Sequence, residues 1–292
     1  MAIPNLGREY ALLVKSRGRS LIAYPLATVV GCLVASHGLP PMLPTALVLV
    51  SLFLVATCVY IYNDLIDSEM DGLNQKKQLR PIPSGKVSNR DAMNLVFLTG
   101  LAGIALGLFT KLEVFVLLSV FTVLFLSYSN PKIRLKRRFI IKEGTVAAGL
   151  LISTLMGGAI AGAISLGVVF QGLFFFSGTF VIYSIFVDYN DVEEDRKYGI
   201  KTLAIELGWK TKMEMAIFYL LTVMIIVTLT YSNLGFNVIF PIMIVGACLL
   251  FLRFLVPIIN SFEKLKYDKA MKSMFAYWML IQTALIIGSL PI

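Results

Sequence analysis

Two clusters of acidic side chains suggest the chemistry of this protein. The first reads YNDLIDSEMD at 62–71 and follows a long uncharged stretch. The second reads DYNDVEED at 188–195 and repeats the spacing of three and then four residues between acids. Positions three, four and seven apart share one helix face, so each cluster is expected to present a stripe of carboxylates. The expected stripes are Asn63, Asp64, Asp67 and Asp71 in the first cluster and Asp188, Asp191 and Asp195 in the second.

The two stripes have the composition of a site for a hard cation. Carboxylates held this close repel one another, and at membrane depth their charge must be offset. Oxygen ligands with no histidine nearby suit Mg²⁺, which usually takes one or two carboxylates together with substrate phosphates. Two facing stripes are therefore expected to hold Mg²⁺ against a diphosphate. Basic residues follow each cluster and are expected to neutralise the remaining phosphate charge: Lys76, Lys77, Arg80, Arg196, Lys197 and Lys201.

The elements that must position these clusters are membrane-spanning helices. Of the 292 residues, 58% are hydrophobic and 15% are charged, whereas soluble proteins carry about 25% charged residues. Several uncharged stretches approach or exceed the ~17–25 residues that cross a bilayer as a helix. The sequence predicts an all-α polytopic membrane protein, a single domain over 1–292 made of two similar halves. The nine predicted spans lie near 20–37, 40–62, 92–109, 112–130, 144–165, 167–187, 214–232, 236–260 and 274–290.

The basic residues predict how these spans are oriented. Of 26 Lys and Arg, all except Lys111 and Arg253 fall on the N-terminal tail or on four long connections, at 63–91, 131–143, 188–213 and 261–273. The positive-inside rule therefore places the N-terminus and both acidic clusters in the cytoplasm. The net charge of +9 is explained by this distribution, and no nucleic acid is expected as a partner. The three cysteines lie in apolar segments at unrelated spacings and predict neither a disulfide framework nor a metal site.

Four segments resemble signatures of the UbiA superfamily of intramembrane prenyltransferases. NDLIDSEMD at 63–71 resembles the family's NDxxDxxxD motif, and DYNDVEEDRKYGIKTLAIELG at 188–208 resembles its second motif, DxxDxxxD. RPIPSGKVS at 80–88 and YSNPKIRLKR at 128–137 are similar to two further signatures. The resemblance covers essentially the whole chain. It implies the UbiA-type fold, with nine helices in a bundle around a central cavity, and Mg²⁺-dependent transfer of a prenyl group from an isoprenyl diphosphate to a lipophilic acceptor.

The resemblance also implies roles for individual residues. Two Mg²⁺ ions are expected, and Asp67, Asp191 and Tyr128 are the expected catalytic residues. Tyr128 and Ser129 are expected near the reacting carbon. The implied metal ligands are principally Asn63, Asp67, Asp191 and Asp195, supported by Asp64, Asp71 and Asp188. The implied holders of diphosphate or an acidic acceptor are Lys76, Arg80, Lys132, Arg134 and Lys201.

The acceptor stays open at this point between two classes. RPIPSG at 80–85 is similar to the corresponding motif of the glycerol-ether lipid and chlorophyll branches of the family. In contrast, the spacing of nine residues from Asp71 to Arg80 is closer to that of the hydroxybenzoate branch. The acceptor is thus a quinone-type aromatic ring or a prenylated glycerol phosphate. A terpene cyclase of the same fold and a membrane transporter that uses the acidic clusters are the alternative functions. No protein partner is predicted.

Overall fold

The long apolar stretches of the chain form helices, the element that satisfies every backbone polar group internally in lipid. The computed structural model describes residues 6–74, 77–187, 189, 192, 196 and 199–291, and this part of the chain contains helices and turns but no strand. The long helices are α1 (Leu6–Ser36), α2 (Met42–Ile66), α4 (Asn89–Gly107), α5 (Leu112–Ser129), α6 (Ile141–Ala161), α7 (Leu166–Gly178), α11 (Trp209–Thr230), α12 (Ile239–Leu255) and α13 (Lys264–Ser289). The π-helix η2 (Thr179–Tyr183) and α8 (Ser184–Val187) continue α7, and the short elements are α3 (Ser68–Gly72), η1 (Leu135–Arg137), α10 (Leu203–Glu206) and η4 (Val256–Ile258).

Seven helices of the described residues are long and apolar enough to cross a membrane. The helix α1 raises this number to eight if its two parts, Leu6–Gly18 and Ser20–Ser36, form one span despite a bend of 72° between them. The helix α4 is not among the seven, because Asn89, Arg90 and Asp91 in its first turn lower its mean hydropathy. The predicted all-helical fold is confirmed, and the count of nine spans stays a prediction.

Several helices extend beyond the apolar segments that predicted them. The helix α1 begins at Leu6 instead of near residue 20, and α13 begins at Lys264 instead of near residue 274. The α1 extension contains basic residues that the sequence placed on the N-terminal tail, and the α13 extension contains those of the connection at 261–273. Helical geometry therefore continues past the apolar boundary, and it brings basic side chains of α1 toward the acidic cluster at 63–71.

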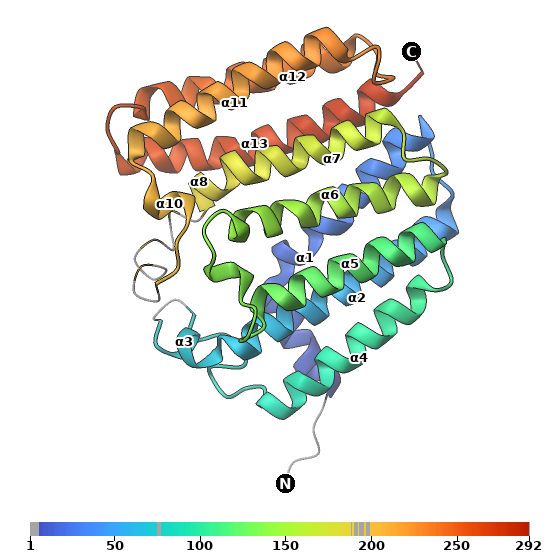
Figure 1. The fold of residues 1–292 in the computed structure, drawn as a ribbon, viewed down its shortest axis with the longest axis vertical. Coiled ribbons are helices and arrows are strands. Elements are labelled where there is room, and N and C mark those ends of the chain that lie inside the picture. Colours follow the sequence, from blue (N-terminus) through green and yellow to red (C-terminus); the bar gives the residue numbers. More distant parts are fainter. Residues whose placement is uncertain are drawn as a thin grey trace.

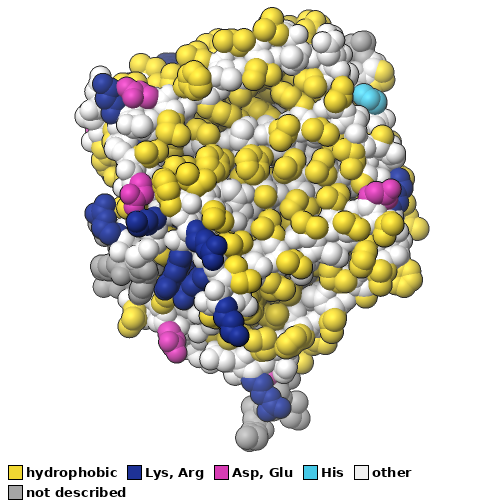
Figure 2. Space-filling model, in the orientation of Figure 1, with side chains coloured by type: hydrophobic (Ala, Val, Ile, Leu, Met, Phe, Trp, Pro, Cys, Tyr) yellow, Lys and Arg dark blue, Asp and Glu magenta, His cyan; other side chains and the backbone are white. Residues whose placement is uncertain are grey.

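The helices lie roughly side by side in layers, with α11 and α12 at one edge of the molecule and α4 at the other (Figure 1). The helix α2 packs on α4, α1 on α6, and α12 on α13. Figure 2 shows hydrophobic side chains over the broad face, while Lys and Arg gather along the edge where α3, α8 and α10 lie in Figure 1. An exposed apolar face bounded by charged ends matches the surface of a protein that lies in a bilayer.

Glycines set the distance between α1 and α6. A Cβ atom on Gly157 of α6 would collide with the carbonyl oxygen of Thr28 and would lie 2.8 Å from the backbone nitrogen of Cys32, both on α1. A Cβ atom on Gly31 of α1 would lie 2.5 Å from the carbonyl oxygen of Thr154 on α6. Small residues at helix contacts allow this close approach in membranes. This close contact fixes the positions of α1 and α6 relative to each other.

We expect Gly157→Ala to lower the free energy of unfolding by about 1–3 kcal/mol, the usual cost of overpacking a close contact. The colliding atoms belong to the backbone of α1, so no side-chain rotation relieves the clash. Thermal unfolding in detergent measures the change. Gly246→Ala in α12 is the matched control, because its Cβ atom would meet nothing within 4 Å. Equal unfolding midpoints for the two variants would contradict the packing argument.

Candidate functional site

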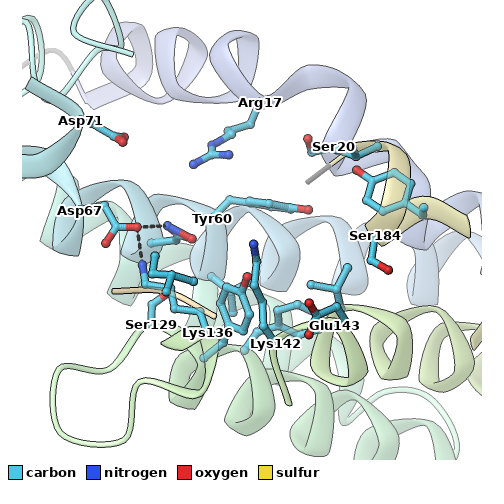
Figure 3. A pocket seen from close by; sticks show the side chains of 18 of the residues that line it. Arg17, Ser20, Tyr60, Asp67, Asp71, Ser129, Lys136, Lys142, Glu143 and Ser184 are labelled. Atoms are coloured by element: carbon cyan, nitrogen blue, oxygen red, sulfur yellow. Dashed lines mark hydrogen bonds and ion pairs between the residues drawn. The ribbon is translucent and has the colours of Figure 1, made fainter. Parts of the chain in front are cut away.

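A cavity of about 310 Å³ opens among α1, α2, α5, α6 and η2. Its polar end carries side chains of the first acidic cluster, and its apolar walls carry aromatic rings. Figure 3 shows Asp67, Asp71 and Ser129 toward one end and Glu143 and Ser184 toward the other, with Arg17 and Tyr60 between them. The described lining is Arg17, Ser20, Tyr24, Val59, Tyr60, Asn63, Asp67, Met70, Asp71, Lys77, Arg80, Phe125, Tyr128, Ser129, Lys136, Lys142, Glu143, Val146, Thr179, Tyr183, Ser184, Val187 and Ile200.

The first acidic cluster lies across a break between two helices. The helix α2 ends at Ile66, Asp67 is its C-cap residue, and α3 begins at Ser68. The helix α2 therefore continues for one turn past residue 62, where the predicted span ended, and is interrupted at Asp67. Asp67 and Asp71 line the cavity, whereas Asp64 does not. The break divides the predicted stripe into two carboxylates at the cavity and one beside it.

Asp67 is contacted by three side chains from two segments, α2 and the segment of η1. Its Oδ2 atom accepts a hydrogen bond of 2.8 Å from Asn63 Nδ2 and an ion-pair hydrogen bond from Lys136 Nζ in η1. Its Oδ1 atom is buried, accepts no hydrogen bond from the described residues, and lies 3.8 Å from Arg134 Nη2. One carboxylate oxygen is thus fixed, while the other stays available to a ligand in the cavity.

Asp64 and Asp71 are neutralised by two arginines. Arg17 donates from Nε to Asp64 Oδ2 at 3.0 Å and from Nη2 to Oδ1, which makes a bidentate pair. Arg80 Nη1 lies 2.7 Å from Asp71 Oδ2 and 3.3 Å from Asp64 Oδ1. The Arg17 guanidinium also lies 5.3 Å from the centre of the Tyr60 ring, a cation–π contact. Four charged groups therefore form one network that joins Arg17 of α1 to the C-terminal end of α2 and the segment that follows it.

Burial shifts the pKa of two groups in this region away from the usual range. Burial raises the pKa of Asp71, and the Arg80 guanidinium opposes this shift. Burial also lowers the pKa of Lys136, and the Asp67 carboxylate opposes that shift. In both pairs the partner's charge works against desolvation. Asp71 and Lys136 are accordingly two charged groups whose ionised forms depend on a directly bound partner of opposite charge.

The structure brings several predicted substrate-binding residues together and leaves others apart. Arg80, Tyr128 and Ser129 line the cavity, and the buried Ser129 Oγ has no hydrogen-bond partner among the described side chains or backbone. Arg134 contacts Asp67 from behind the cavity wall and adopts a left-handed backbone conformation. Lys132 and Lys201 are exposed and do not line the cavity. The predicted Lys76, Asp188, Asp191 and Asp195 lie outside the described residues, as do Lys197 and the other masked positions of that segment.

Sequence reasoning missed four charged residues of the cavity: Arg17, Lys136, Lys142 and Glu143. The run of bases at 132–142 pointed to Lys132 and Arg134, but Lys136 is the buried lysine that reaches Asp67. No local pattern distinguishes Lys136 from its neighbours. Glu143 had a usable signal, because it is the only acidic residue between Glu113 and Asp188 and it begins an apolar stretch.

The oxygen atoms at the end of the cavity that holds Asp67 and Asp71 could supply part of a Mg²⁺ site. Asn63, Asp67 and Asp71 line the cavity with oxygen ligands, and Asp67 offers the unpartnered Oδ1 atom. Within the described residues no three acidic or histidine side chains lie close enough together to hold a metal ion. The first cluster alone thus provides only part of a metal coordination shell. This is expected for an ion that also binds substrate phosphate and ligands from another segment of the chain.

Comparison with known proteins gives matches over nearly the whole chain. The model of the UbiA prenyltransferase family matches residues 24–280. A curated relative, the digeranylgeranylglyceryl phosphate synthase of Sulfurisphaera tokodaii, is 29% identical over an alignment that covers 94% of this chain and 96% of the relative. The matched region includes every described residue of the cavity from Tyr24 to Ile200.

Two solved structures share the arrangement of helices. One, a digeranylgeranylglyceryl phosphate synthase, superposes with a TM-score of 0.80 at 22% identity and covers 99% of this chain and 100% of that one. The other is a UbiA homologue from Archaeoglobus fulgidus bound to GPP and Mg²⁺, with a TM-score of 0.73 at 17% identity, covering 95% and 99%. At these identities the likeness establishes the fold.

Proposed function

This chain belongs to the UbiA prenyltransferase family, and we propose that it joins a polyprenyl diphosphate, such as geranylgeranyl diphosphate, to a prenylated glycerol phosphate. The reaction forms an ether between the prenyl C1 atom and the glycerol hydroxyl and releases diphosphate. The observation that carries this choice is the full-length similarity to a digeranylgeranylglyceryl phosphate synthase, at 29% identity. The chain is a prenyltransferase, and the proposal concerns its acceptor.

The charge of the cavity supports an acceptor that carries a phosphate. Three acids, Asp67, Asp71 and Glu143, face five bases along the described lining. A diphosphate and a phosphate monoester together bring more negative charge than a diphosphate and a quinone-type aromatic acceptor such as 4-hydroxybenzoate, which carries one carboxylate. These bases can bind a second phosphate group, and together with the similarity to the named synthases they favour the glycerol phosphate over a quinone-type acceptor. The five bases are Arg17, Lys77, Arg80, Lys136 and Lys142.

Mg²⁺ belongs to this proposal as the cofactor that assists diphosphate departure. Asn63, Asp67 and Asp71 would hold it from the described part of the chain, with Asp188, Asp191 and Asp195 as the proposed ligands of the second cluster. When bound there, Mg²⁺ neutralises negative charge on the leaving diphosphate. The Archaeoglobus fulgidus homologue, bound to GPP and Mg²⁺, supports the choice of metal.

The chain's own residues account for the remaining tasks of the reaction. Lys136 and Arg80 supply positive charge beside the acidic cluster, where the diphosphate leaves. Tyr60, Phe125 and Tyr128 line the cavity wall, where aromatic rings exclude water and favour positive charge at the prenyl C1 atom. Both effects favour attack by the acceptor over capture of the prenyl group by water.

The orientation in the membrane follows from the same residues. We place the N-terminus and the connections that carry the basic residues in the cytoplasm, with nine spans in total. The edge rich in Lys and Arg (Figure 2) and the positive-inside rule support this placement.

The proposal is tested by product analysis of purified protein in lipid nanodiscs. Geranylgeranyl diphosphate, Mg²⁺ and a geranylgeranylated glycerol phosphate are expected to give a diether, detected by mass spectrometry, and excess EDTA is expected to abolish it. Parallel reactions contain 4-hydroxybenzoate or no acceptor. Prenylated hydroxybenzoate without diether would overturn the choice of acceptor. Cyclic hydrocarbon in the reaction without acceptor would identify a terpene cyclase instead.

A further inference from the structure

Glu143 is a buried carboxylate at the end of the cavity away from Asp67 (Figure 3). The residue is 3% exposed and lies in the first turn of α6. Its Oε1 atom accepts a hydrogen bond of 2.8 Å from the backbone nitrogen of Leu203. Its Oε2 atom is buried, and no described residue donates a hydrogen bond to it. Glu143 thus has one anchored oxygen and one oxygen without a partner on the wall of the reaction cavity.

The fixed position of this carboxylate indicates a ligand for the second oxygen. A buried charged acceptor left without a donor is unfavourable, so such a group in a folded protein indicates a place where a ligand completes it. The first turn of α6 provides a compensating field, because the N-terminal end of a helix stabilises a negative charge. The Leu203 hydrogen bond fixes the orientation of the carboxylate, which is the preorganisation that proton transfer requires.

The other carboxylates of the described lining are differently engaged. Asp67 is bound to Lys136, and Asp71 is bound to Arg80. No ion pair joins Glu143 to a described side chain, although it shares the cavity with those bases. The oxygen that a cationic side chain binds is occupied by that contact, whereas Oε2 of Glu143 has no described donor. Glu143 is therefore the described carboxylate best placed to accept a proton from a substrate.

On the basis of the proposed function, we propose that Glu143 is the general base of the transfer reaction. The hydroxyl oxygen of the glycerol phosphate acceptor attacks the prenyl C1 atom and forms the C–O bond of the ether. The bond from C1 to the diphosphate oxygen breaks, and its electron pair leaves with the diphosphate. The hydroxyl proton moves to Glu143 Oε2. The acceptor hydroxyl accordingly binds at the end of the cavity that holds Glu143 and Ser184, with the leaving diphosphate at the end that holds Asp67.

The decisive variant is Glu143→Gln, which keeps an oxygen for the Leu203 hydrogen bond but cannot accept the proton. We expect kcat for diether formation to fall by about 10²- to 10⁴-fold, the usual contribution of a general base. The KM for geranylgeranyl diphosphate, the Mg²⁺ requirement and the unfolding midpoint are expected to stay at the wild-type values. In Glu143→Ala, added formate is expected to restore part of kcat, a response that a purely structural role would not produce.

Glu113→Gln is the matched control, because Glu113 is also an acid in the first turn of a membrane helix but is exposed and lies outside the cavity. A wild-type kcat in Glu143→Gln, or a raised Mg²⁺ requirement with kcat unchanged, would overturn the assignment of Glu143 as the general base. In that case, diether synthesis by the wild-type protein would still uphold the proposed function. Absence of diether with the wild type would overturn both. The two failures are thereby distinguished in one experiment.

Discussion

Asp67→Asn is expected to lower kcat/KM for prenyl transfer by at least about 10²-fold, the effect of removing one preorganised charge from an active site. Asp67 supplies the one oxygen of the first acidic cluster that lines the cavity, is buried and accepts no hydrogen bond from described groups. The amide keeps the size of the side chain and an acceptor for Lys136, so the loss is one of charge. Diphosphate release, followed with a coupled phosphate assay over a range of Mg²⁺ concentrations, measures the effect.

Asp67→Glu separates charge from position. The longer side chain keeps the carboxylate but moves it relative to Asn63 and Lys136, which hold Asp67 Oδ2 in the native protein. We expect activity to stay low, because an error of about 1 Å in a reacting geometry can cost about 10²-fold. Full activity in this variant would show that charge alone suffices and would contradict the assigned geometry.

Glu69→Gln is the matched control for both variants. Glu69 belongs to the same acidic segment, two residues from Asp67, but it is exposed and does not line the cavity. We expect near wild-type activity. If Glu69→Gln lost as much activity as Asp67→Asn, the acidic segment would act through its total charge. The distinction between cavity carboxylates and surface carboxylates would then fail.

The helical fold was predictable because it depends on local sequence properties. Uncharged stretches of bilayer length specify helices, and the spacing of Asp64, Asp67 and Asp71 places them within two turns of one another. The break at Asp67 was not predictable, because nothing in the segment IDSEM specifies that the chain bends there. That bend decides which carboxylates face the cavity.

The basic half of the site was harder to predict, since it depends on contacts between distant segments. Arg17 meets Asp64 across 47 residues, and Lys136 meets Asp67 across 69. Both bases sit in runs of Lys and Arg whose membrane-orienting role explains their presence without any further function. Only the packing of α1 and η1 against the end of α2 selects these two from their neighbours. The contacts of the buried side chains therefore identify which bases belong to the site, and the number of charges in the sequence does not.

The pairing of Asp64 with Arg17 and Arg80 leads to a second large expected effect, on stability. The resemblance to the family implies that Asp64 supports the metal, yet its carboxylate is 2% exposed and both of its oxygens are bound to arginine. A metal ligand in this position would require Arg17 to move. The geometry instead indicates that Asp64 holds the two arginines and, through them, the contact between α1 and the first acidic cluster.

Asp64→Ala is expected to lower the free energy of unfolding by about 3–5 kcal/mol, the usual cost of leaving a buried charge without its partner. Arg17 is 18% exposed and Arg80 is 26% exposed at their side chains, so neither gains full hydration in compensation. Thermal unfolding in detergent without Mg²⁺ or substrate measures the loss. Asp268→Asn is the control, because its ion pair with Lys264 is exposed and is worth only about 0–1 kcal/mol.

A double-mutant cycle of Asp64→Ala with Arg17→Met tests whether the loss comes from the unpaired cation. Removing Arg17 from the Asp64→Ala protein takes away the buried charge, so the double variant is expected to be more stable than Asp64→Ala alone. If Asp64 acted chiefly as a metal ligand, Asp64→Ala would leave the metal-free protein as stable as the wild type and would abolish only the stabilisation by added Mg²⁺. The stability of the metal-free protein therefore tests whether Asp64 is the structural anchor of Arg17. The stabilisation by added Mg²⁺ tests whether Asp64 is a metal ligand instead, and Asp67 remains the carboxylate that faces the substrate.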